Sequence, residues 1–174
     1  MGDARADIMG LSDYVYQRTR NRLAGLTDDE YFWEPVPGCC TIRRTESGDY
    51  RADYAEWSGN PPFTTIAWRL WHLGSECLAG YTRHGLGPWP LQVQDGEWYA
   101  APGPALEALD QAWRAFREGL AQLGEAGLWQ PPGTAGDEPA ERPWAGLVLH
   151  AQDELSHHGA EIALLRDLYV RQGG

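Results

Sequence analysis

The sequence contains no lysine, so all fourteen of its basic residues are arginines, and twenty-five acidic residues outnumber them. The formal net charge of −11 would repel a phosphate backbone, because proteins that bind nucleic acid normally present a basic face to it. We therefore expect no nucleic acid and no anionic membrane among the partners of this protein.

Cysteines and long apolar runs are also scarce. Only three cysteines are present, and two of them, Cys39 and Cys40, are adjacent, so they do not make a disulfide framework. No apolar run approaches the ~20 residues that a membrane span requires, and Asp3, Arg5 and Asp7 stand where a signal peptide would be apolar. These absences predict a soluble, cytoplasmic protein in a reducing compartment.

The chain has the size of one ordinary domain, with 174 residues of which 43% are hydrophobic. No internal repeat divides it, so we expect a single domain spanning residues 1–174. Nine tryptophans and eight tyrosines are many for this length. Their rings either fill the core and its rim or line a cleft, because each needs an apolar bed and a hydrogen-bond partner at one end.

Apolar residues recur with helical spacing in four long segments, which predicts four amphipathic helices joined by two long connections. Between the first two helices, two short segments with strand-like residues, 40–44 and 50–54, predict a small hairpin. The fold expected is all-α, a four-helix bundle with long crossover loops and this hairpin. The four helices are expected at about residues 3–26, 62–81, 104–123 and 143–171.

The last predicted helix carries two polar side chains in the middle of its apolar face. Glu154 and His158 are four residues apart, so their side chains point to one spot, and burying both is costly unless something satisfies them. His72 on the second helix, with Glu76 one turn later, could face them across the bundle. Two imidazoles and a carboxylate around one cation leave open positions, as catalytic metal sites do.

Another interpretation of these residues is that they are hydrogen-bonded groups of an ordinary core, which is the commoner fate of a histidine on an apolar face. His150 and His157 point away from the centre of the stripe and are expected at the rim or surface, and His84 is given no role. Glu154 and His157 form a single Glu-x-x-His motif. A dinuclear carboxylate site needs two such motifs, so it is not expected.

Three segments of the sequence, residues 33–38, 65–73 and 156–166, resemble the DinB/YfiT-like superfamily, and the similarity covers essentially the whole chain. The resemblance implies a single DinB-like domain, commonly dimeric, that binds one divalent metal between the second and fourth helices. The three histidines of the family pattern correspond here to His72, Glu154 and His158, so a glutamate replaces the middle one. Glutamate oxygen can also bind Zn²⁺, Ni²⁺ or Fe²⁺.

Members of that superfamily include thiol S-transferases that use bacillithiol or mycothiol and a mycothiol-dependent maleylpyruvate isomerase. The resemblance therefore implies a metal-dependent enzyme that acts on a small molecule, with zinc as the first choice of metal, nickel or iron as alternatives, and a low-molecular-weight thiol as a second cofactor. Asp153 and Glu76 are candidates to support the ligands, and Arg69 or Arg166 to hold an anionic substrate.

Two non-catalytic functions remain as alternatives. One is a bundle that encloses a small apolar ligand among Trp68, Trp71 and Trp113. The other is a structural homodimer whose aromatic residues form the interface and whose metal site is degenerate.

Overall fold

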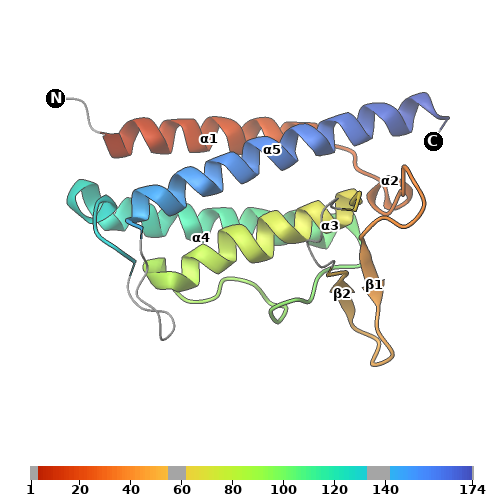
Figure 1. The fold of residues 1–174 in the computed structure, drawn as a ribbon, viewed down its shortest axis with the longest axis horizontal. Coiled ribbons are helices and arrows are strands. Elements are labelled where there is room, and N and C mark those ends of the chain that lie inside the picture. The colour runs from red at the N-terminus through yellow and green to blue at the C-terminus, as the bar shows by residue number, and fades with distance from the viewer. Residues whose placement is uncertain (1–3, 55–61, 133–141, 174) are drawn as a thin grey trace.

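The computed structural model describes residues 4–54, 62–132 and 142–173 (Figure 1). This part of the chain is mostly helical and contains one small antiparallel sheet of two strands. None of the described helices is both long and apolar enough to cross a bilayer. The helices are α1 (Ala4–Arg22), α2 (Asp28–Tyr31), α3 (Ile66–Trp71), the π-helices η1 (His72–Ala79) and η2 (Thr82–Leu86), α4 (Pro102–Leu128) and α5 (Trp144–Arg171), and the strands are β1 (Ile42–Arg44) and β2 (Tyr50–Ala52).

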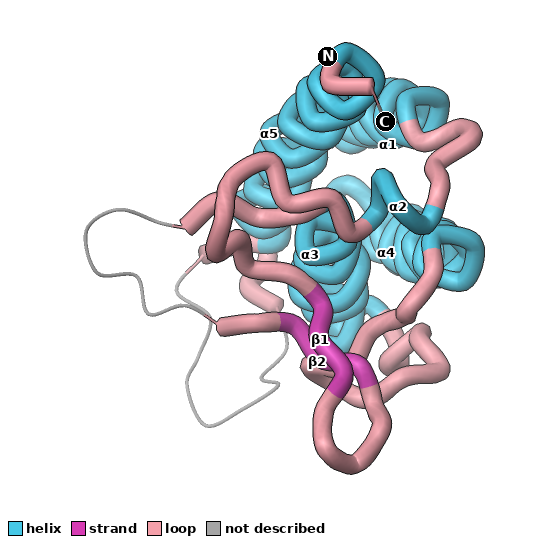
Figure 2. Tube along the Cα trace, turned by 90° about the vertical axis from the view of Figure 1, so that its right-hand side faces the viewer, coloured by secondary structure: helices cyan, strands magenta, loops and turns pink. Residues whose placement is uncertain are grey.

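The long helices pack in pairs along one axis. Helix α1 lies beside α5, and α4 lies beside the continuous rod formed by α3 and η1 (Figures 1 and 2). Helix α5 also contacts this rod, so the first residues of η1 and the middle of α5 face each other. That contact holds the candidate site described below.

Local signals mark the ends of several helices. The Thr27 side chain accepts a hydrogen bond from the backbone N–H of Glu30 and begins α2, as an N-cap residue should. Pro143 stands directly before α5, close to the predicted start of the last helix. The helical backbone of α4 breaks at Gly124, which has a φ of 73°. The regular part of α4 therefore ends at Leu123, the residue at which the sequence predicts the helix to end.

The second predicted helix differs from the expectation at both ends. It begins at Ile66 and not near residue 62, because the preceding residues are extended and pair with Cys40: the Cys40 N–H donates to Phe63 O at 2.8 Å, and the Thr65 N–H donates to Cys40 O at 3.0 Å. Its helical backbone also continues past the predicted end at Tyr81 into η2.

The predicted hairpin is confirmed. Strands β1 and β2 pair antiparallel, with Arg43 opposite Arg51. The free edge of β2 is covered, because the Trp98 N–H donates to Tyr50 O at 2.9 Å. The hairpin therefore ties the connection after η2 to the segment before α3.

Several of the aromatic side chains fill the core. Trp71 is fully buried, and the ring of Trp113 stacks on Tyr16 with centroids 4.4 Å apart. Trp68 contacts Trp71 edge to face and stacks on the imidazole of His72, with centroids 5.2 Å apart. Trp68 and Trp71, two of the three tryptophans proposed to enclose an apolar ligand, thus pack beside His72.

Candidate metal centre

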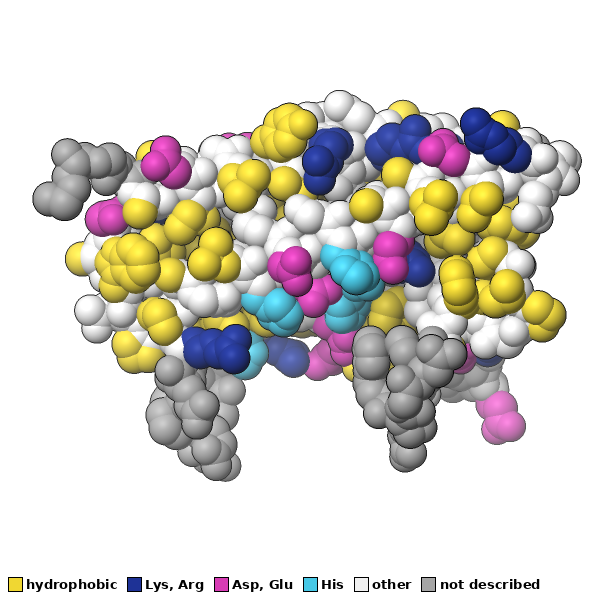
Figure 3. All heavy atoms as spheres, turned by 45° about the horizontal axis from the view of Figure 1, so that its top comes forward, with side chains coloured by type: hydrophobic (Ala, Val, Ile, Leu, Met, Phe, Trp, Pro, Cys, Tyr) yellow, Lys and Arg dark blue, Asp and Glu magenta, His cyan; other side chains and the backbone are white. Residues whose placement is uncertain are grey.

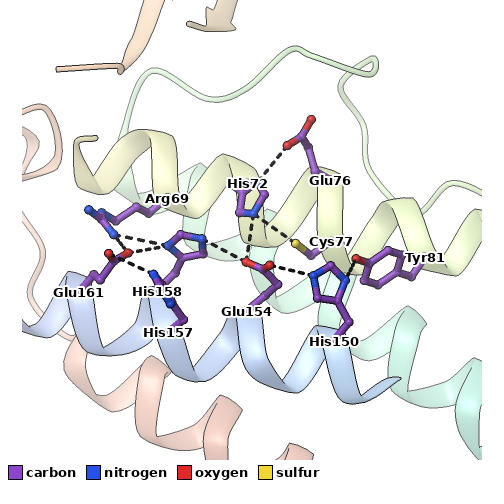
Figure 4. Close-up of polar contacts among 10 residues, drawn as sticks. All are labelled: Arg69, His72, Glu76, Cys77, Tyr81, His150, Glu154, His157, His158 and Glu161. Atoms are coloured by element: carbon purple, nitrogen blue, oxygen red, sulfur yellow. Dashed lines mark hydrogen bonds and ion pairs between the residues drawn. The ribbon is translucent and has the colours of Figure 1, made fainter. Parts of the chain in front are cut away.

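The site lies where the first turn of η1 faces the middle of α5. His72 Nε2 is 3.2 Å from Glu154 Oε2, and His158 Nε2 is 3.1 Å from the same oxygen (Figure 4). The structure therefore brings together the three residues that the sequence predicts as metal ligands. Their side chains are 15–20% exposed, so a small ligand could reach them without a change of fold.

A second carboxylate stands behind each imidazole. His72 Nδ1 donates to Glu76 Oε2 at 2.8 Å, and His158 Nδ1 donates to Glu161 Oε2 at 2.7 Å. These bonds fix the rotation of both rings so that each Nε2 faces Glu154. Carboxylates in this position orient histidine ligands in metal sites and make them better donors. Glu76 thus occupies the supporting position predicted for it, whereas Asp153 is exposed on α5.

The charges at this site are strongly coupled. Burial opposes protonation of His72, but its hydrogen bonds to Cys77, Glu154 and Glu76 raise its pKa to about 11. The hydrogen bonds from His158 and His72 hold the pKa of Glu154 far below its ordinary value. Burial lowers the pKa of His158, and the hydrogen bond to Glu154 offsets this lowering only in part.

Arg69 is the only one of the two proposed substrate-binding arginines that lies at this site. Arg69 is 6% exposed, and its guanidinium forms an ion pair with Glu161 and lies 3.4 Å from His158 Nδ1. Burial lowers the pKa of Arg69 to about 10, so it stays charged at neutral pH. Arg166 instead donates to Glu30 at 2.6 Å and to the backbone carbonyl of Ala24 at 2.9 Å, which places it in the contact between α5 and the segment after α1.

Three side chains make contacts at the site that reasoning from the sequence did not predict. Glu161 follows His158 by three residues, and His150, whose Nε2 lies 3.0 Å from Glu154 Oε1, precedes Glu154 by four. Helical spacing could have indicated both. The third, Cys77, has its Sγ 3.6 Å from His72 Nε2, and no α-helical spacing predicts that contact.

The predicted rim positions of His150 and His157 agree with their exposure, 51% and 59% of their side chains. Histidines and acidic residues form one patch in the middle of a face of the molecule, between hydrophobic areas (Figure 3). His150 also bonds Tyr81 at 2.6 Å, and His157 Nε2 is 3.2 Å from Glu161 Oε1. Both histidines therefore border the site.

Two features favour a divalent cation at these residues. Donor atoms bound at about 2.0–2.1 Å with bond angles of about 90–109° lie about 2.8–3.4 Å apart, and the contacts of both Nε2 atoms with Glu154 are within that range. The second feature is a shortage of protons. A neutral imidazole has one N–H, and burial keeps the pKa of His158 low, yet His158 faces a carboxylate with both of its nitrogens.

Charge gives the same result. Glu76, Glu154 and Glu161 bring three negative charges and Arg69 brings one positive charge, so two negative charges remain once a cation has displaced the extra proton of His72 and both imidazoles are neutral. A divalent cation would balance them and would bind the two Nε2 atoms in place of the protons that they donate to Glu154.

Fold and site together define a mostly helical protein with a candidate metal centre between two of its long helices. The sequence model of the DinB superfamily matches residues 12–162, and the chain belongs to this superfamily, many of whose members bind a metal. No curated protein and no solved structure gives a significant match to the chain.

Proposed function

We propose that this protein is a metal-dependent enzyme of the DinB-like type, in which His72, Glu154 and His158 hold one divalent cation. The observation that carries the proposal is the meeting of both Nε2 atoms at one oxygen of Glu154 while carboxylates engage both Nδ1 atoms. Zinc is the first choice, because imidazole and carboxylate are ordinary zinc ligands, and nickel or iron are alternatives.

The reaction proposed is transfer of a low-molecular-weight thiol to an electrophile, or an isomerisation that uses such a thiol, as in the enzymes that the sequence resembles. A bound cation lowers the pKa of a thiol or water ligand and so supplies a nucleophile at neutral pH. Arg69 provides positive charge beside His158, where it favours an anionic group of the substrate. The stacked ring of Trp68 limits the access of water to His72.

A cytoplasmic four-helix bundle that forms a homodimer is the setting we propose for this chemistry. The pairing of α1 with α5 and of α4 with the α3–η1 rod supports the bundle. The homodimer and the compartment rest on the sequence and on the resemblance to the superfamily. Size-exclusion chromatography with light scattering would test the dimer.

The metal can be tested directly on the purified full-length protein. A metal at about 100 times its Kd should stabilise the fold by about 2.7 kcal/mol, which raises the Tm by several degrees. We expect stoichiometric metal by elemental analysis and a Tm that rises when zinc is added to the chelator-treated protein. A protein that carries no metal and whose Tm is insensitive to zinc and nickel would refute the proposal.

Histidine variants test which side chains bind the metal. His72→Ala and His158→Ala should each abolish binding, whereas His157→Ala and His84→Ala should retain it, because His157 pairs with Glu161 and His84 lies in η2, beyond the turn of η1 that faces α5. Equal losses in all four variants would contradict the placement. For the reaction class, the rate of a thiol with an electrophile should be lost with chelator and return with zinc, and a rate that chelator leaves unchanged would argue against metal-dependent catalysis.

A further inference from the structure

Cys77 stands inside the candidate metal centre but is absent from the three-residue pattern of the superfamily. Its Sγ is 3.6 Å from His72 Nε2, and donor atoms of His72, Cys77 and Glu154 all lie within 4.8 Å of one another. The side chain is buried and comes from the same helix as His72. In the view of Figure 4, Cys77 and His158 lie on opposite sides of His72.

The π-helical backbone of η1 produces this contact. In an α-helix, residues five positions apart differ by about 500° in direction, so their side chains point about 140° apart. The i→i+5 hydrogen bonds of a π-helix make each turn wider, which brings residues five apart nearly above one another. Residues 72–79 adopt this geometry, so Cys77 lies over His72 and faces the same space.

We propose that Cys77 supplies a thiolate ligand to the cation held by His72 and Glu154. This inference rests on the proposed function, because it needs the cation to be present. A sulfur bound at about 2.3 Å and a nitrogen bound at about 2.0–2.1 Å, at a tetrahedral angle, are about 3.6 Å apart, which is the distance between Cys77 Sγ and His72 Nε2. The thiol proton is released to solvent when the cation binds.

A sulfur ligand changes which metals the site prefers. Thiolate favours zinc and cobalt over magnesium, calcium and manganese, which take oxygen ligands. The thiolate also adds a ligand to the imidazole and carboxylate groups. Cys77 thus compensates for the histidine ligand that the family pattern has at the position of Glu154. The site would then bind zinc through nitrogen, oxygen and sulfur.

The test is the absorption spectrum of the full-length protein loaded with Co²⁺. Cobalt bound at the site gives visible bands whatever its ligands, and a thiolate ligand adds an intense sulfur-to-cobalt band in the near ultraviolet. We expect both in the wild-type protein. Cys77→Ala should keep the visible bands, lose the near-ultraviolet band and bind Co²⁺ at least about 10-fold more weakly, the smallest loss typical even for a residue that only supports a ligand.

A matched control comes from the other two cysteines. The variant Cys39→Ser/Cys40→Ser leaves Cys77 as the only thiol, so it should keep the near-ultraviolet band and the wild-type affinity. If Cys77→Ala does not fold, the band in this double variant still assigns the sulfur ligand to Cys77, and its absence there overturns the assignment.

The two proposals fail in different ways. Visible bands without a near-ultraviolet band in the wild-type protein would overturn the role of Cys77 and leave the metal site intact. No visible bands, together with no rise of Tm on adding Co²⁺ or zinc, would overturn the proposed function itself.

Discussion

The carboxylate behind His72 offers the sharpest test of how the site is built. Glu76 accepts a hydrogen bond of 2.8 Å from His72 Nδ1 and is itself held by the hydroxyl of Tyr54. In Glu76→Ala the imidazole loses the partner that fixes both its rotation and its tautomer. Loss of such a partner typically weakens metal binding about 10–100-fold, which corresponds to about 1.4–2.7 kcal/mol. Because the Glu76 side chain is 31% exposed, we expect the lower half of that range.

The assay is a competition titration of zinc between the protein and a chromophoric chelator, at fixed pH and ionic strength. Affinity is the quantity to compare, because removing Glu76 also changes the stability of the metal-free protein and would confuse a comparison of Tm values. Circular dichroism of the metal-free variant checks that the helices are kept.

Asp153→Ala is the matched control. It removes the same charge from a residue next to Glu154, but Asp153 is exposed on α5, and Glu76 and Glu161 are the carboxylates that engage the Nδ1 atoms of the two histidines. Its zinc affinity should therefore change less than about threefold, as for a screened surface charge. If both variants weaken zinc equally, the effect is one of net charge and the supporting role of Glu76 is wrong. An unchanged affinity in Glu76→Ala would refute it as well.

Two further predictions concern the packing and charge of α1 against its neighbours. A Cβ on Gly159 would clash with Thr19 Oγ1, so Gly159→Ala should destabilise the protein by about 1–2 kcal/mol in urea unfolding, although alanine gains about 1 kcal/mol of helix propensity. In a Thr19→Ala background the same change should be neutral or stabilising, and a stabilising effect in the wild-type protein would contradict the close approach. Burial opposes ionisation of Asp110, but hydrogen bonds from Arg20 and Tyr16 hold its pKa below the ordinary value. The ionised Asp110 therefore contributes fully to the stability of the fold above about pH 4, and this contribution is lost as the pH falls through the lowered pKa. Asp110→Asn should lower the free energy of unfolding by about 1 kcal/mol at pH 7, and its stability should fall less steeply in acid than that of the wild-type protein. Parallel pH profiles of stability for the two proteins would contradict this prediction.

Much of the fold and part of the site could be predicted from the sequence, because both depend on local periodicity. A stripe of apolar residues every three or four positions indicates a helix and tells which face is buried. That reasoning placed Glu154 and His158 on the inner face of α5 and His72 on the rod opposite, and the structure brings the three together. It also found the hairpin, whose segments are rich in strand-forming residues.

The tertiary structure decided what local periodicity does not contain. The pairing of Cys40 with the segment before α3 joins residues more than twenty positions apart, and it delays the start of that helix. Whether a segment forms α-helical or wider π-helical turns depends on how its backbone packs in the fold. The contact of Cys77 with His72 could therefore not be predicted from the sequence alone. Burial of Arg69 against Glu161 likewise depends on two helices meeting. The sequence thus determined which side chains face inward, and packing determined which of them meet.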